Sequence, residues 1–85
     1  MKILFFSAPW CAPCKTFKPI VESVCNKKGL PFEMVDISIN SALAQQYHVK
    51  SVPTVVFINS KTSAFFRLAK ASPKADFREW LEALV

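Results

Sequence analysis

The chain has 85 residues, 52% of them hydrophobic, and a formal net charge of +5; this size predicts a single domain over residues 1–85, and the apolar composition excludes a disordered linker. Its 11 Lys and Arg residues form no basic run and no apolar stretch is as long as a membrane span, so neither nucleic acid nor a membrane is an expected partner. Three cysteines are too few for a disulfide-stapled secreted scaffold, and we expect a monomer in the reducing cytoplasm.

The first predicted elements are a buried strand and a long helix. The apolar run that begins at Ile3 predicts a central strand over residues 3–7, buried on both faces. A helix is expected from Cys11 to Lys28, with apolar residues recurring at helical spacing on one face: Phe17, Ile20, Val21 and Val24. Gly29 follows two lysines and can take the left-handed conformation that ends a helix.

The rest of the chain predicts three more strands and two more helices. A second strand is expected over residues 30–37, and Asn40 or Ser41 can cap a short helix that ends near Tyr47. A turn over residues 50–54, a third strand over 55–58, a hairpin turn over 59–62 and a fourth strand over 64–68 follow. The last helix is expected to begin at Ser72-Pro73, with an inner face made of Phe77, Trp80, Leu81 and Leu84. The element order is therefore βαβαββα.

Two cysteines separated by two residues lie directly behind the first strand. Cys11 and Cys14 fall at i and i+3 on one helical face, where two sulfurs can bond with little backbone movement. This spacing between a strand and a helix is typical of a redox dithiol. Cys11 lies at the helix N-terminus, and Lys15 follows one turn along the helix. Both features favour the thiolate, so the pKa of Cys11 is expected below that of a free thiol.

The positions of Cys11 and Cys14 predict different roles in a redox reaction, and a zinc site is the alternative. Cys11 is the candidate nucleophile, and Cys14 is the candidate resolving thiol that releases the reduced substrate. The alternative is a zinc half-site completed by Cys25 and His48. Because those two ligands do not form a second compact pair, we expect no metal. Cys25 is predicted to be a buried, small apolar residue, with a regulatory thiol as the alternative, and His48 a solvated surface group.

The redox motif and the segment before the third strand resemble a known family. The run Trp10-Cys11-Ala12-Pro13-Cys14-Lys15 resembles the Trp-Cys-Gly-Pro-Cys-Lys motif of the thioredoxin superfamily, and residues 47–54, Tyr-His-Val-Lys-Ser-Val-Pro-Thr, resemble the segment that carries the family's cis-proline. Pro19 lies where thioredoxins carry a proline inside the helix. The resemblance implies a short thioredoxin-like α/β fold of the minimal type shared with glutaredoxins. Its four-stranded mixed sheet would be flanked by helices.

The resemblance also implies a function and a substrate site. The chain would be a thiol–disulfide oxidoreductase that reduces disulfide-containing protein substrates and is recharged by a thioredoxin-type reductase, with no cofactor. Pro53 would be cis and pack against the dithiol, and the Val52 backbone would pair with an extended substrate segment. Thr54 completes this substrate-binding segment, and Trp10 would face partners beside an exposed Cys11 sulfur. Supporting roles would fall to Pro13 and Lys15.

Several positions depart from the family pattern. Phe5 stands where thioredoxins carry a buried aspartate, and Met34 stands for the lysine that pairs with it. Residues 70–73 lack the Gly-Gly pair with which glutaredoxins receive glutathione, so glutathione binding is not expected. The alternatives are a glutaredoxin-like or ribonucleotide-reductase-dedicated electron donor and, from another class, a non-catalytic binding subunit with the same fold.

Overall fold

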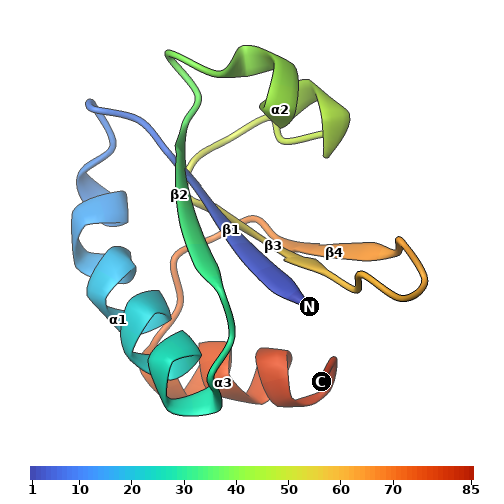
Figure 1. Cartoon of the computed structure of the whole chain (residues 1–85). Coiled ribbons are helices and arrows are strands. Elements are labelled where there is room, and N and C mark those ends of the chain that lie inside the picture. The colour runs from blue at the N-terminus through green and yellow to red at the C-terminus, as the bar shows by residue number, and fades with distance from the viewer.

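The computed structural model describes residues 1–85 and has a mixed sheet with helices on both faces (Figure 1). The elements follow the predicted order: β1 (Lys2–Ser7), α1 (Ala12–Lys28), β2 (Phe32–Asp36), α2 (Ser41–Gln46), β3 (Thr54–Ile58), β4 (Phe65–Leu68) and α3 (Lys74–Glu82). The strand order is β2-β1-β3-β4, with β1 parallel to β2 and both other pairs antiparallel. The predicted α/β fold with a four-stranded mixed sheet is therefore confirmed. None of the helices is long and apolar enough to cross a membrane.

Strand β1 is central and has no free face, as its apolar sequence predicts. Ile3 and Phe5 are fully buried in a cluster with residues of α1 and α3, whereas Leu4 and Phe6 pack on the opposite face of the sheet against Ala44 of α2. Alternation of side chains along a strand produces this division into two cores. Burial on both faces excludes polar side chains from β1 between its first residue, Lys2, and its last residue, Ser7.

The helix boundaries follow from local hydrogen-bond chemistry. Gly29 ends α1 with φ of 65°, and its N–H donates to the Asn26 carbonyl, while the N–H of Leu30 donates to the Cys25 carbonyl. Glycine takes this left-handed conformation without a Cβ penalty. At α2, the side chain of Asn40 accepts a hydrogen bond from the Leu43 N–H at 3.2 Å. Both predicted caps are confirmed.

Strand β2 is shorter than the predicted residues 30–37. Pro31 has no N–H to donate to a ladder, although its carbonyl accepts from the N–H of Ile3 at 2.9 Å. Leu30 and Ile37 lie outside β2, yet both still pack against the apolar core. The apolar pattern therefore marks the buried segment correctly, while hydrogen bonding sets the narrower bounds of the strand.

Phe5 and Met34 are register partners in neighbouring strands, as the family alignment requires. The Phe5 ring is fully buried, with its centroid 5.8 Å from Phe17 and 6.3 Å from Phe32. Met34 is 41% exposed, so this register partner of Phe5 lies at the surface and not in the core. Val35, the next residue of the same outer strand, is buried in the core on the other face of the sheet. The pair is thus one buried ring beside one half-exposed side chain.

Phe5→Asp is expected to lower the free energy of unfolding by about 4 kcal/mol, because it removes a core ring and buries a carboxyl group without a partner. Adding Met34→Lys should restore about 1 kcal/mol, since a lysine there can reach the carboxylate while its ammonium group stays near solvent. Chemical denaturation of both single variants and the double variant measures this coupling.

Phe66→Lys is the matched control for this coupling, because Phe66 is 46% exposed on β4, the opposite outer strand. A coupling near zero for Met34→Lys, or an equal coupling for Phe66→Lys, would contradict the observed register of Phe5 and Met34.

Candidate redox-active site

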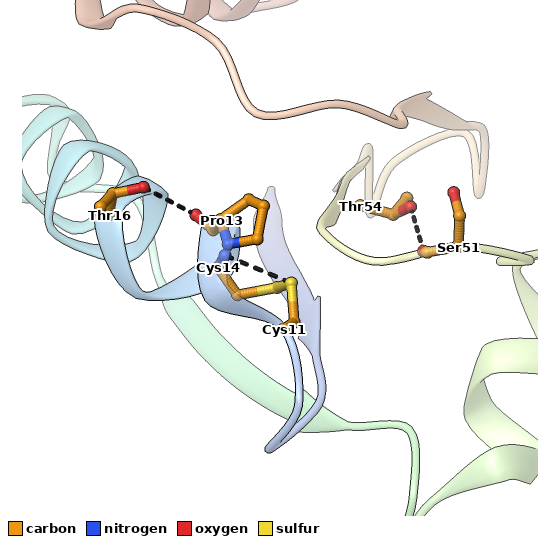
Figure 2. The surroundings of a disulfide bond; sticks show 6 residues. All are labelled: Cys11, Pro13, Cys14, Thr16, Ser51 and Thr54. Carbon is orange, nitrogen blue, oxygen red and sulfur yellow. Dashed lines mark hydrogen bonds between the residues drawn. A yellow bond between two sulfur atoms is a disulfide. The ribbon is translucent and has the colours of Figure 1, made fainter.

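The end of β1 delivers the two cysteines to the start of α1. The Cys11 N–H donates to the Ala8 carbonyl at 3.1 Å, which turns the chain so that Cys11 becomes the N-cap of α1. Cys14 lies in the first turn, and the two cysteines are joined by a disulfide with their Cα atoms 5.4 Å apart (Figure 2). Pro13 occupies the first turn, where a helix does not need its N–H. The predicted pairing of Cys11 with Cys14 is confirmed.

The two sulfurs differ in their hydrogen bonding to the N-terminus of α1. The N–H of Cys14 donates to the Cys11 Sγ at 3.2 Å (Figure 2), so a backbone amide points at one sulfur of the pair. The first turn of α1 contains no acidic residue, and Lys15 adds a cation there. Amide donors, the helix dipole and a nearby cation all stabilise negative charge at the N-terminus. The arrangement therefore favours a thiolate on Cys11.

Exposure does not distinguish the two cysteines. Cys11 and Cys14 are each 5% exposed and belong to the apolar core that also contains Ala8. The expectation of an exposed Cys11 sulfur is therefore wrong for this oxidised form, because the cross-linked sulfurs pack into the core. Trp10 is 69% exposed beside them. The indole of Trp10, rather than a sulfur, is therefore the exposed group at this position.

The segment before β3 lies across from the disulfide. The Val52–Pro53 peptide bond is cis, as the resemblance implied, and Pro53 is buried. Val52 packs against the core cluster that contains both cysteines. The Thr54 hydroxyl donates to the Ser51 carbonyl at 2.7 Å, and Figure 2 shows both residues on the side of the site opposite Cys11. This hydrogen bond fixes the turn from which the next strand begins.

The other residues weighed as ligands lie apart from the dithiol. Cys25 is fully buried in the core and forms no disulfide. Burial raises the pKa of Cys25 from 9.0 to about 11, so the thiol is protonated at neutral pH. His48 is exposed, with its ring stacked 6.4 Å from that of Phe65. No three or more His, Cys, Asp or Glu side chains form a group that could hold a metal ion.

A basic hollow beside this turn was missed by the sequence analysis. It has a volume of about 330 Å³ and is lined by His48, Val49, Lys50, Ser51, Thr54, Arg67 and Ala69. The lysines are scattered along the sequence, and Arg67 lies within the predicted fourth strand. The pairing of β4 with β3 could have indicated this hollow. It places Arg67 opposite Val56 and close to the loop that precedes β3.

Comparisons with known proteins find matches over nearly the whole chain. The family model described as thioredoxin matches residues 1–83. A thioredoxin from Mycoplasmoides gallisepticum is 35% identical over 81 residues, which cover 94% of this chain and 80% of that protein. Thioredoxin C-3 from Corynebacterium nephridii is 32% identical over 76 residues, and the match spans 52% of its length.

Solved structures show the same fold. The germline-specific thioredoxin Deadhead from Drosophila melanogaster superposes with a TM-score of 0.85 at 28% identity, over 98% of this chain and 79% of that one. Thioredoxin 1 from Thermosipho africanus gives a TM-score of 0.86 at 24% identity, over 99% and 93% of the two chains. At that lower identity the likeness concerns the fold alone.

The raised pKa of Cys25 predicts a specific dependence of stability on pH. Between pH 9.0 and about 11 the unfolded chain loses the Cys25 proton while the folded chain keeps it. The stabilisation from the buried Cys25 thiol is therefore complete below pH 9.0 and is lost as the pH rises through about 11, by about 3 kcal/mol in all. The measurement compares the free energy of unfolding with that of Cys25→Ala, both with Cys11 and Cys14 replaced by serine. A difference that stays constant through pH 11 would contradict the burial of this thiol.

Proposed function

Because the chain belongs to the thioredoxin family of protein disulfide oxidoreductases, we propose that Cys11 attacks disulfides of protein substrates and that Cys14 resolves the mixed disulfide. The observation that carries this assignment is the Cys14 N–H that points at the Cys11 sulfur. A thiolate stabilised in this way is the form that attacks a disulfide.

The reaction is two successive thiol–disulfide exchanges. The Cys11 thiolate attacks one sulfur of the substrate, a Cys11–substrate disulfide forms, and the other substrate sulfur leaves as a thiolate that takes up a proton. The Cys14 thiolate then attacks Cys11, which closes the Cys11–Cys14 disulfide and releases the second substrate thiolate. The substrate gains two electrons and two protons, and the protein is left oxidised. The electrons come from the two sulfurs, so the mechanism needs no cofactor.

Proton transfer during resolution has no buried carboxylate to use. The buried polar residues of the chain are Thr54 and Ser72, and Phe5 occupies the position of the family's aspartate. The Cys14 proton therefore passes to water or to the substrate thiolate released in the first exchange, because the Cys11 sulfur is bonded to substrate at this stage. This route distinguishes the chain from family members that carry the buried aspartate.

Substrate binding is assigned to the surface around the disulfide. Trp10 offers an exposed ring, and the Val52 backbone pairs with an extended substrate segment in the manner of an added strand. Pro53 covers the dithiol, and Thr54 holds the turn through its bond to the Ser51 carbonyl. These roles rest on the positions that match the family's motif.

The cellular setting follows from the chemistry. A dithiol that donates electrons must be reduced again, so a thioredoxin-type reductase is the proposed electron source. The reducing cytoplasm keeps such a pair in its active state and keeps Cys25 a thiol, which supports a cytoplasmic location. We take residues 1–85 as one domain that acts as a monomer.

Serine replacements separate the two roles. Cys11→Ser is expected to abolish reduction of insulin disulfides, because no other sulfur occupies the N-cap position of α1. Cys14→Ser is expected to keep the attack but to accumulate mixed disulfides with substrates, visible by non-reducing electrophoresis and mass spectrometry. Cys25→Ala is the matched control, and it should retain insulin reduction.

Accumulation of mixed disulfides by Cys11→Ser instead of Cys14→Ser would reverse the assignment. Full insulin reduction by Cys11→Ser would favour a non-catalytic role for the pair.

A further inference from the structure

The basic hollow lies beside the segment proposed to bind substrate. Its lining includes Ser51 and Thr54, which flank the Val52–Pro53 peptide. It also includes Ala69, which follows the end of β4. An extended segment paired with the Val52 backbone would therefore run along its edge. In such a segment every second side chain points the same way, so a side chain near the substrate cysteine can enter the hollow.

Arg67 is held in place at this hollow. Its guanidinium donates to the His48 carbonyl at 2.6 Å. His48 has a φ of 56°, and its ring stacks on that of Phe65, so the loop and β4 are tied together at this point. A guanidinium has five N–H donors, and one of them makes this bond. The remaining donors are available to an acceptor from outside the chain.

The lining has cations without acidic partners. It contains Lys50 and Arg67 and no Asp or Glu. The ion pairs of the structure lie elsewhere, between Lys2 and Glu33 and between Lys28 and Glu82. An acidic group that enters the hollow therefore meets two cations that no carboxylate of the protein neutralises. The fixed planar fork of Arg67 suits a carboxylate in particular.

We propose that Lys50 and Arg67 select protein substrates that carry Asp or Glu close to the attacked cysteine. This inference rests on the proposed function, because it names the substrate class of the same site. The occupant is a carboxylate on an extended polypeptide, since the hollow adjoins the backbone that pairs with substrate. Attraction of this kind raises the rate of encounter and excludes segments with basic residues at the same place.

The test uses reduced protein and two synthetic peptides, each with one cysteine capped as a mixed disulfide with 2-mercaptoethanol. The peptides are identical except that Glu or Lys flanks the cysteine. The second-order rate of reduction is measured by stopped-flow fluorescence, and the readout is the ratio of the two rates. We expect the acidic peptide to react about tenfold faster at low ionic strength. In 1 M NaCl, where the Debye length is ~3 Å, the ratio should approach one.

Charge-reversal variants distinguish the effect of Lys50 and Arg67 from the effect of the net charge of the protein. Lys50→Glu/Arg67→Glu should reverse the preference, and Lys50→Glu alone should reduce it without removing the bond between Arg67 and the His48 carbonyl. Lys27→Glu/Lys61→Glu is the matched control, because it changes two exposed lysines away from the hollow and alters the net charge equally. It should keep most of the preference.

Each outcome decides between this proposal and the function on which it rests. The proposal would be overturned if the wild-type protein reduced the acidic and basic peptides at equal rates. It would also be overturned if Lys27→Glu/Lys61→Glu lost the preference for the acidic peptide as completely as Lys50→Glu/Arg67→Glu. In both cases the proposed reduction of disulfides would stand. If the wild-type protein reduced neither peptide nor 2-hydroxyethyl disulfide, a small uncharged substrate, the proposed function would fail and the inference with it.

Discussion

Burial of β1 on both faces is the constraint on which the rest of the structure depends. Helices α1 and α3 bury Ile3 and Phe5 on one face of the sheet. On the other face, Leu4 and Phe6 pack against α2. The strand is polar only at its two ends, Lys2 and Ser7, and it leaves the core after Phe6. The chain then turns through Ala8 and enters α1 at Cys11. The position of the reactive sulfur at a helix N-terminus is thus a consequence of how the core is closed.

The asymmetry between the cysteines is electrostatic rather than steric. Both are 5% exposed, so access alone gives no reason for one to attack and the other to resolve. The amide of Cys14 points at Cys11, and the first turn of α1 carries no acid to oppose it. Cys25 shows the opposite case, because burial without a donor raises the pKa of that thiol to about 11. Cys11 at the N-cap of α1 and Cys25 near the other end of this helix therefore lie in opposite electrostatic surroundings.

Local sequence predicted most of the fold and the centre of the site. The apolar run of β1, the Gly29 cap and the spacing of Cys11 and Cys14 are short-range signals, and each was confirmed. The cis Val52–Pro53 bond came from family resemblance, because base rates alone favour trans. What could not be predicted depends on contacts between distant segments. The exposure of Met34 depends on how each face of the sheet is covered, and the basic hollow forms because β4 lies beside the loop at His48.

The central claim is that Cys11 is the more reactive thiol of the pair, and selective alkylation tests it most directly. The fully reduced protein is treated at neutral pH with less than one equivalent of iodoacetamide, and the site of modification is found by peptide mapping. The account predicts that the label lies on Cys11, because the thiolate reacts and the helix terminus favours it there. Label found mainly on Cys14, or divided equally between the two, would contradict the account.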